Sequence, residues 1–369
     1  MSVTIDITGL TPDRIRVASS PLAELGMALH ALAEPGHHPG LQGWATATSA
    51  ALDPCLADRL LEADFLWRTT FSDVFMPFAG LPGRSEVPAG TLAGELDQLD
   101  KLSDDQFVDA ALEFTCEASY GERRALQVLG DPAAHRRALD LAATRGPQQV
   151  RFTERLLRDP PSVRAWFRRL MEDCDEAFFA DTWAGMVHTL AADARHRGEL
   201  LRRKGLAETL AATSGALSVD EEERRISVDK LAEGRTATGD AGLTLVPTSM
   251  GWPHLMVLHR YGWQPVLHYP TAAPGPANRS SVEQLTRRME ALAHPVRMRL
   301  CRHLARGPYT TSELSDAHGM TAPEISRHLT VLKKAGLVTT RRRGRYVLHQ
   351  LDLSVVARLG GDFIEGVLR

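Results

Sequence analysis

The sequence predicts a mainly α protein with a small β component. A large N-terminal helical domain with a small sheet is followed by a smaller C-terminal domain of short helices and a β-hairpin. Three observations support this fold class. Apolar residues recur at helical spacing through most of residues 20–213, short runs rich in β-branched and aromatic residues follow, and a stretch of Pro, Gly and small polar residues comes next. We therefore expect a regulatory domain at 1–270, a linker at 271–281 and a second domain at 282–369.

The N-terminal domain is expected to be helical, with β segments near 3–8 and 216–270. Residues 3–8 alternate apolar and polar side chains, which is a strand pattern. Three helix starts are marked by an N-cap residue followed by Pro, or by a capping box. They lie at 20–21, 103–106 and 131–132.

Composition limits the function classes. The chain has 369 residues, of which 43% are hydrophobic and 24% charged, as in soluble globular proteins. No run approaches the roughly 18 apolar residues that span a bilayer, and residues 1–17 lack a secretory signal. The four cysteines lie far apart without a CxxC pair, which favours free thiols in a reducing compartment. We therefore expect a cytoplasmic protein with no membrane partner.

Charge is divided unevenly along the chain. The net charge of −3 combines residues 283–369, with 15 Lys and Arg against 8 Asp and Glu, and the preceding residues, with 28 against 38. A basic end on an acidic body indicates a polyanionic partner for the C-terminal domain only.

Two short capped helices joined by a Gly turn follow in the C-terminal domain. Thr310 with Glu313 forms one capping box, and Thr321 with Glu324 forms a second one eleven residues later. Gly319 lies in the turn between them. This is the pattern of a helix-turn-helix.

The second of these helices has one apolar and one polar face. Ile325, Leu329 and Leu332 form an apolar stripe at helical spacing. Hydroxyl groups and long cations occupy the other side, which suits a helix that lies in a major groove of DNA. The residues expected to contact DNA here are Thr321, Ala322, Glu324, Ser326, Arg327, Thr330, Lys333 and Lys334.

Residues 337–351 are predicted to form a β-hairpin beside that helix. Its tip carries Arg341, Arg342, Arg343 and Arg345. A basic hairpin next to a recognition helix is expected to hold phosphates or to enter an adjacent minor groove, as the wing of a winged helix does. Amphipathic helices with solvated charges are common. It is the helix-turn-helix, the wing and the basic end together that predict binding to double-stranded operator DNA.

From about Glu283 to Leu351 the chain resembles the ArsR/SmtB winged-helix regulators of bacteria. The matching stretches are "ALAHPVRMRLCRHL", "TSELSDAHGMTAPEISRHLTVLKKAGLV" and "RRRGRYVLHQL", in order and without gaps. The resemblance implies a winged helix-turn-helix fold, a homodimer, and a repressor that leaves its operator when an effector binds. The N-terminal part resembles, less sharply, an uncharacterised region fused ahead of such winged helices in actinobacterial regulators, on "DRIRVASSPLAELGMALHAL" and "GWPHLMVL". That second resemblance implies no activity.

The chain departs from the metal-sensing members of that family. Where arsenic and cadmium sensors carry Cys-x-Cys, this chain has Thr310 and Ser312, which cannot supply thiolates. Asp352 matches the Asp of the zinc sensors, but Ser354 stands where their His is expected. Asp352 is more simply an N-cap of the last helix, so the sequence predicts no metal in the winged helix, and no cofactor is expected for the chain.

The N-terminal domain carries no recognisable catalytic motif, so we expect no enzyme. His254 and His259 are an odd number of residues apart and would face opposite sides of a regular strand, so no three metal ligands are expected to converge there. We expect instead that Trp252, His254 and Trp263 line a pocket for an apolar small-molecule effector. Two alternatives stay open, a half-buried aromatic sheet and a surface that docks a protein partner.

The helices that flank the winged helix are predicted to mediate dimerisation, because their apolar residues exceed what one small domain needs for its own core. These residues are Leu285, Met289, Leu292, Val355, Val356, Leu359, Phe363 and Val367.

Overall fold

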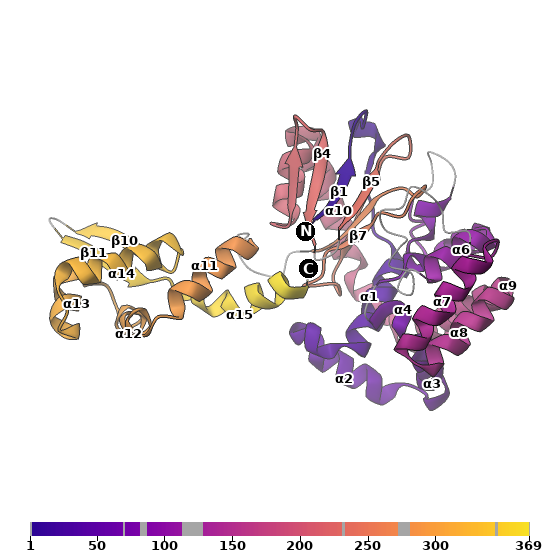
Figure 1. The fold of residues 1–369 in the computed structure, drawn as a ribbon, viewed down its shortest axis with the longest axis horizontal. Coiled ribbons are helices and arrows are strands. Elements are labelled where there is room, and N and C mark those ends of the chain that lie inside the picture. The colour runs from indigo at the N-terminus through magenta and orange to yellow at the C-terminus, as the bar shows by residue number, and fades with distance from the viewer. Residues whose placement is uncertain are drawn as a thin grey trace. The chain divides into compact units, whose positions relative to one another are not determined.

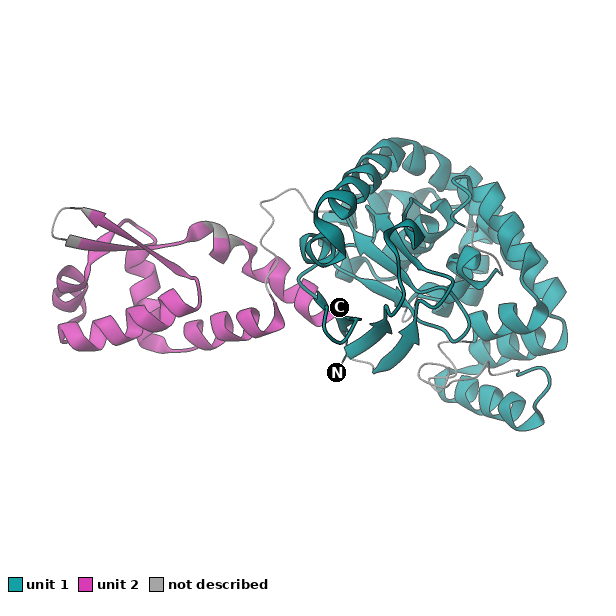
Figure 2. Ribbon diagram, turned by 90° about the horizontal axis from the view of Figure 1, so that it is seen from above, with its two compact units in different colours: residues 1–277, 369 teal, residues 278–368 magenta. Residues whose placement is uncertain are grey.

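The computed structural model describes residues 2–68, 71–81, 87–112, 128–230, 233–271, 281–343 and 346–368. The chain divides into two compact units, unit 1 (residues 1–277) and unit 2 (residues 278–368), and each is described by itself (Figure 2). The predicted linker falls mostly on residues 272–280, outside the described residues. Within the described part, none of the helices is both long and apolar enough to cross a membrane.

Unit 1 is built around α1 (Pro21–Ala33), and eleven of its thirteen residues are buried. It begins where Ser20 Oγ accepts a hydrogen bond from the N–H of Ala23 at 3.1 Å, with Pro21 at the first helical position. The helix packs against α2 (Gln42–Ala51), α4 (Phe65–Arg68), α5 (Leu92–Lys101) and β6 (Leu243–Thr248). This explains why its sequence is apolar nearly all round. Gly26 is required by this packing, because an added Cβ would lie 2.7 Å from the ring of Phe71.

The other helices of unit 1 follow in chain order (Figure 1). They are α2 (Gln42–Ala51), α3 (Pro54–Ala63), α4 (Phe65–Arg68), α5 (Leu92–Lys101), α6 (Asp104–Ala111), α7 (Pro132–Arg145), α8 (Pro147–Arg158), α9 (Pro160–Cys174) and α10 (Ala180–Thr213). Short helical turns are η1 (Pro12–Arg14), η2 (Pro35–His37), η3 (Pro39–Leu41), η4 (Asp73–Phe75), η5 (Pro77–Gly80) and the π-helical η7 (Asp175–Phe179).

Two four-stranded sheets complete unit 1. The first has the order β3-β4-β1-β5, in which β1 runs antiparallel to β4 and parallel to β5. The second has the order β2-β6-β8-β7, and all six residues of its strand β6 are buried. The strands are β1 (Ser2–Asp6), β2 (Ile15–Val17), β3 (Leu217–Asp220), β4 (Arg225–Asp229), β5 (Gly234–Ala237), β6 (Leu243–Thr248), β7 (Met256–Leu258) and β8 (Val266–Pro270).

The predicted fold class, mainly α with a small β component, is confirmed. The three predicted helix starts of unit 1 are also confirmed, including the capping box of Ser103 and Gln106 and the Asp131 cap. The sequence predicts one small sheet, whereas the structure has two. The strand missed is β2, which is only three residues long and pairs in parallel with β6 from Ile15 to Leu243.

Unit 2 is a winged helix-turn-helix (Figure 1). Its three-stranded sheet has the order β10-β11-β9. A single apolar core joins its helices, with Leu300, Leu314, Ile325 and Leu332 fully buried. Its elements are α11 (Val282–Leu292), α12 (Pro295–Leu304), β9 (Tyr309–Thr310), α13 (Thr311–His318), α14 (Ala322–Lys334), β10 (Val338–Arg343), β11 (Tyr346–Leu351) and α15 (Leu353–Leu368).

Candidate nucleic-acid interface

The start of α14 is fixed by local hydrogen bonds. Glu324 Oε2 accepts from the main-chain N–H of Thr321 at 2.9 Å and from its hydroxyl at 2.8 Å. The N–H of Thr321 holds the pKa of the Glu324 carboxyl below its usual range. The helix stops at Gly336, which has φ +70°. Glu324 thus serves first to position this helix.

The two faces of α14 differ as its sequence pattern predicts. Ile325, Leu329 and Leu332 are buried in the core of unit 2. Val331 is 41% exposed on the outer face, a residue that the sequence analysis did not single out. The outer face can donate and accept hydrogen bonds, carries positive charge and offers apolar contacts as well. Its exposed residues are Thr321, Ala322, Pro323, Ser326, Arg327, Thr330, Val331, Lys333 and Lys334.

The helix that precedes α14 is held by the same kind of cap. The hydroxyl of Thr310 donates to Glu313 at 2.8 Å and accepts from the N–H of Glu313 at 3.2 Å. Gly319 closes α13 in the left-handed conformation, with φ +62°. Leu314 of α13 is fully buried and packs in the same core as α14. The turn therefore holds the two helices in one fixed arrangement.

The strands β10 and β11 form the predicted hairpin, with Val338 opposite Leu351 and Arg343 opposite Tyr346. Arg341 and Arg342 are exposed, and as neighbours in a strand they point to opposite faces of the hairpin. Only the backbone of Arg343 is described, and the prediction for Arg345 lies outside the described residues.

Five exposed cations lie on α14 and β10, namely Arg327, Lys333, Lys334, Arg341 and Arg342. None of them forms a salt bridge with a residue in the described part of the chain. Two arginines of α11, by contrast, are paired. Arg287 contacts Glu283 at 2.5 Å, and Arg288 contacts Asp362 at 2.7 Å. Five exposed cations without a salt bridge therefore lie on α14 and β10, near the single carboxylate of Glu324, and this excess of positive charge suits a polyanion.

The positions used by metal-sensing relatives have other tasks in this chain. The hydroxyl of Thr310 belongs to the cap of α13. Asp352 Oδ1 accepts from the N–H of Val355 at 3.3 Å, which confirms its expected role as the N-cap of α15. Cys301 is buried, and burial raises the pKa of its thiol.

The three residues predicted to line an effector pocket in unit 1 lie in two places. The ring of Trp263 is 6% exposed and packs so closely on Gly80 that an added Cβ there would lie 2.6 Å from it. The guanidinium of Arg260 lies 5.8 Å from the Trp263 ring centroid and pairs with the buried Asp73 at 2.7 Å. Trp263 is therefore part of the helical core.

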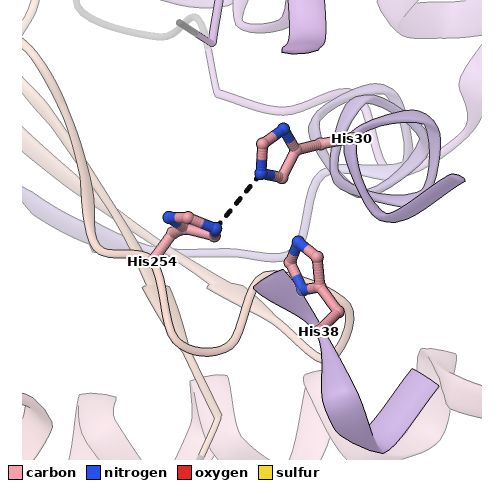
Figure 3. A group of neighbouring side chains, drawn as sticks. All are labelled: His30, His38 and His254. Carbon is pink, nitrogen blue, oxygen red and sulfur yellow. Dashed lines mark hydrogen bonds between the residues drawn. The ribbon is translucent and has the colours of Figure 1, made fainter. Parts of the chain in front are cut away.

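Trp252 and His254, by contrast, lie beside two further histidines. Figure 3 shows His254 with these two, His30 and His38. The carbonyl oxygen of Trp252 is 2.7 Å from Nδ1 of His38, and Nε2 of His254 is 3.1 Å from Nε2 of His30. The sequence predicts no three converging ligands around His254, and the structure corrects this. Within residues 252–268 no three ligands converge, because the other two histidines come from residues 30–38. The sequence signal was the adjacent pair His37-His38 soon after a helix with a buried His.

Comparison with known proteins gives two family matches. A family described as a family of unknown function (DUF5937) matches residues 1–275, and a helix-turn-helix domain family matches residues 292–341. The biofilm growth-associated repressor of Agrobacterium fabrum is 34% identical over 86 residues, which are 23% of this chain and 74% of that protein. The HTH-type transcriptional repressor SmtB of Mycobacterium tuberculosis is 36% identical over 99 residues, 25% of this chain and 73% of that protein. A solved possible transcriptional regulator for arsenical resistance is 38% identical, covers 21% of this chain and 79% of its own, and aligns with a TM-score of 0.20.

Proposed function

We propose that this chain is a transcriptional repressor that a ligand of unit 1 releases from operator DNA. The chain belongs to the DUF5937 family over residues 1–275 and to the ArsR/SmtB winged-helix regulators in its C-terminal part. Its place of action is then the cytoplasm, and it needs no catalytic step.

The observation that carries the proposal is the unpaired basic face of α14 next to the wing. An α-helix fits the major groove, where Arg pairs with guanine and hydroxyl groups pair with several bases. Ser326, Arg327 and Thr330 lie on the exposed side of α14, and we assign them to base edges. The exposed methyl groups of Val331 suit the methyl group of thymine. Phosphates are assigned to Lys333, Lys334, Arg341, Arg342, Arg343 and Arg345, with Thr321 and Ala322 at the helix start.

A homodimer is proposed because α11 and α15 keep large apolar side chains exposed. Met289, Phe363 and Val367 are 39%, 43% and 49% exposed, although Leu285 on the same helix pair is buried against Gly366. A two-fold interface over these helices would cover them and would present two copies of α14. The operator is then a near palindrome whose half-sites are about 34 Å apart.

Unit 1 is proposed as the sensor. The winged helix lacks thiolates at Thr310 and Ser312, and its Asp352 caps a helix. Unit 1, in contrast, holds two large cores of its own. The sequence predicts an apolar effector there, but of its three predicted contacts Trp263 is packed into the core. Trp252 and His254 are still proposed to contact the effector. A ligand releases DNA if it favours a dimer geometry in which the two copies of α14 no longer match the half-sites.

The test of DNA binding is footprinting of the upstream region of the protein's own gene with the full chain. The expected result is protection of one palindromic site, with affinity that falls steeply as salt rises because bound counterions are released from the phosphates. Uniform protection of unrelated DNA would contradict sequence-specific recognition by α14.

A further inference from the structure

Three buried histidines of unit 1 direct ring nitrogens toward one point (Figure 3). His30 lies in the last turn of α1, His38 lies between η2 and η3, and His254 lies in the loop before β7. Their side chains are 7%, 1% and 8% exposed. One ring nitrogen of each can be chosen so that all three atoms lie within 4.8 Å of one another.

The hydrogen bonds of His30 and His38 fix which nitrogen faces the centre. Nδ1 of His30 lies 2.6 Å from the carbonyl oxygen of Trp67, and Nδ1 of His38 lies 2.7 Å from the carbonyl oxygen of Trp252. A carbonyl oxygen only accepts, so each Nδ1 carries the proton. In the neutral ring the lone pair is then on Nε2.

A carbonyl oxygen that accepts from one ring nitrogen is the usual support of a histidine that binds a metal through the other nitrogen. The same support is present twice here. Packing alone gives no reason for two buried histidines to have the same tautomer and to direct their free nitrogens toward the same point. Metal binding does give such a reason.

A hydrogen bond between rings does not account for the whole cluster. Nε2 of His254 lies 3.1 Å from Nε2 of His30, and a proton on His254 would satisfy that pair. Nε2 of His38 is buried and finds no hydrogen-bond partner among the described residues, which costs free energy. One metal ion would use all three nitrogens. At a Zn–N distance of about 2.0–2.1 Å, two nitrogen ligands of a tetrahedral site lie roughly 3.3–3.4 Å apart. The observed separation of the Nε2 atoms of His254 and His30, 3.1 Å, is close to this.

We propose that His30, His38 and His254 bind one divalent transition-metal ion of the Zn²⁺ class through their Nε2 atoms. Imidazole nitrogens suit Zn²⁺, Co²⁺, Ni²⁺ and Cu²⁺, whereas Mg²⁺ and Ca²⁺ require oxygen ligands. Three neutral ligands leave a fourth position for water or a small molecule, as in zinc sites that stay open. His37 lies next to the cluster, with its ring centroid 5.5 Å from that of His254. Its Nδ1 atom is buried and has no hydrogen-bond partner within the described chain.

The charge of the ion has a nearby partial compensation. Glu34 follows α1 directly, and its carboxylate favours positive charge at His30. The Glu34 carboxylate also pairs with Arg68, whose Nε lies 3.5 Å from Oε1 of Glu34. An anionic group in the fourth position would supply further compensation, which favours small ligands with an oxygen anion.

The site would connect two segments that are far apart in sequence, since His30 and His254 are separated by 224 positions. Binding would fix the end of α1 to the loop before β7. The site itself does not depend on the proposed function. Only its use as the sensed signal, with the ion or an ion-bound small molecule as effector, rests on the repressor assignment.

The test uses the metal-free full chain, prepared without a polyhistidine tag, and titrates it with Co²⁺ and then Zn²⁺. The expected result is one Co²⁺ per chain with the visible absorption of a four-coordinate ion, and its displacement by one Zn²⁺. No saturable binding, or a six-coordinate spectrum, would overturn the proposal.

The variants His38→Gln and His254→Gln should lower Co²⁺ affinity by at least about 100-fold, more than the loss of a supporting hydrogen bond costs. The matched controls His188→Gln and His196→Gln remove exposed histidines of α10 and should bind as the parent does. His254→Cys should keep binding and add a thiolate-to-Co²⁺ charge-transfer band, a signature that a merely structural histidine cannot give. Equal affinity in all four glutamine variants, or no such band in a folded His254→Cys chain, would contradict the site. Operator binding by the metal-free chain, measured in parallel, tests the proposed function separately.

Discussion

The buried guanidinium of Arg288 donates to the carboxylate of Asp362 across 2.7 Å and so joins α11 to α15. Both side chains are at most 8% exposed. The pair lies on the two helices that we assign to the dimer interface. A strong pair would therefore hold these two helices in a fixed arrangement at that interface.

Replacing Arg288 by Ala should destabilise unit 2 by up to about 3–5 kcal/mol, because the buried carboxylate of Asp362 then keeps only the more distant Arg358, at 3.8 Å. The neighbouring Arg287→Ala is the matched control. Arg287 pairs with Glu283 on the surface, with side chains 53% and 78% exposed, and its loss should cost only ~0.5 kcal/mol or less. Hydrogen exchange of α11 and α15 in the full chain measures both. Equal exchange in the two variants would show that the buried pair does not hold the helices together.

Replacing Arg327 by Ala should weaken operator binding by about 1–3 kcal/mol and relax the preference at one base position, because a base contact is lost. Arg341→Ala should instead weaken binding to all sequences alike and lower the salt slope by about one unit, as loss of a phosphate contact does. Titrations at several salt concentrations on operator and mismatched DNA distinguish the two. Indistinguishable profiles would refute this division of roles between α14 and the wing.

Replacing Phe363 by Glu should convert the dimer into a monomer, because it would bury a carboxylate against its two-fold copy. Leu61→Glu in unit 1 is the control, since Leu61 is also a large exposed apolar residue, at 55% against 43% for Phe363. It should leave the association unchanged. Sedimentation at micromolar concentration measures both. A parent chain that sediments as a monomer, or a Phe363→Glu chain that stays dimeric, would place the interface elsewhere or remove it.

Unit 1 should lose stability as the pH rises from about 5 to about 9, because two buried carboxyl groups resist ionisation. Burial raises the pKa of Glu95 from 4.5 to about 8 and that of Glu24 to about 7. A raised folded-state pKa gives stability that is fully present below the unfolded value and is lost as pH passes the folded value. Glu95→Gln, which cannot ionise, should flatten this dependence, whereas Glu199→Gln on the exposed side of α10 should not.

Tryptophan fluorescence during thermal unfolding reads this effect selectively, because all six tryptophans lie in unit 1. A slope that is the same in Glu95→Gln and in the parent would show that Glu95 is ionised in the folded protein.

The helix starts and the two faces of α14 could be predicted from the sequence because they depend on neighbouring residues. The caps at Ser20, Ser103 and Thr310 are formed within three positions of the chain, and the buried stripe of α14 repeats with the helical period. The short strand β2 could not be predicted, since three residues carry no clear alternation and their partner is β6, more than 200 positions away.

The histidine cluster was missed for a similar reason. An argument from strand alternation holds only inside a regular strand, and His254 lies in the loop before β7. His30 looked like one polar residue in an apolar helix, and nothing local shows that it meets His254. The predicted placement of Trp263 in a pocket failed to anticipate the close approach of Gly80, which is also a tertiary contact.

The most direct measurement of the central claim, that unit 1 senses and unit 2 binds DNA, is the affinity of the full chain for its operator with Zn²⁺ and with a chelator. We predict that Zn²⁺ lowers the affinity of the full chain at least about tenfold, or ~1.4 kcal/mol of coupling. A chain that starts at Ser281 should bind the operator equally well in both conditions. If that shorter chain responded to Zn²⁺ as strongly as the full chain, sensing would reside in the winged helix and the central claim would be contradicted.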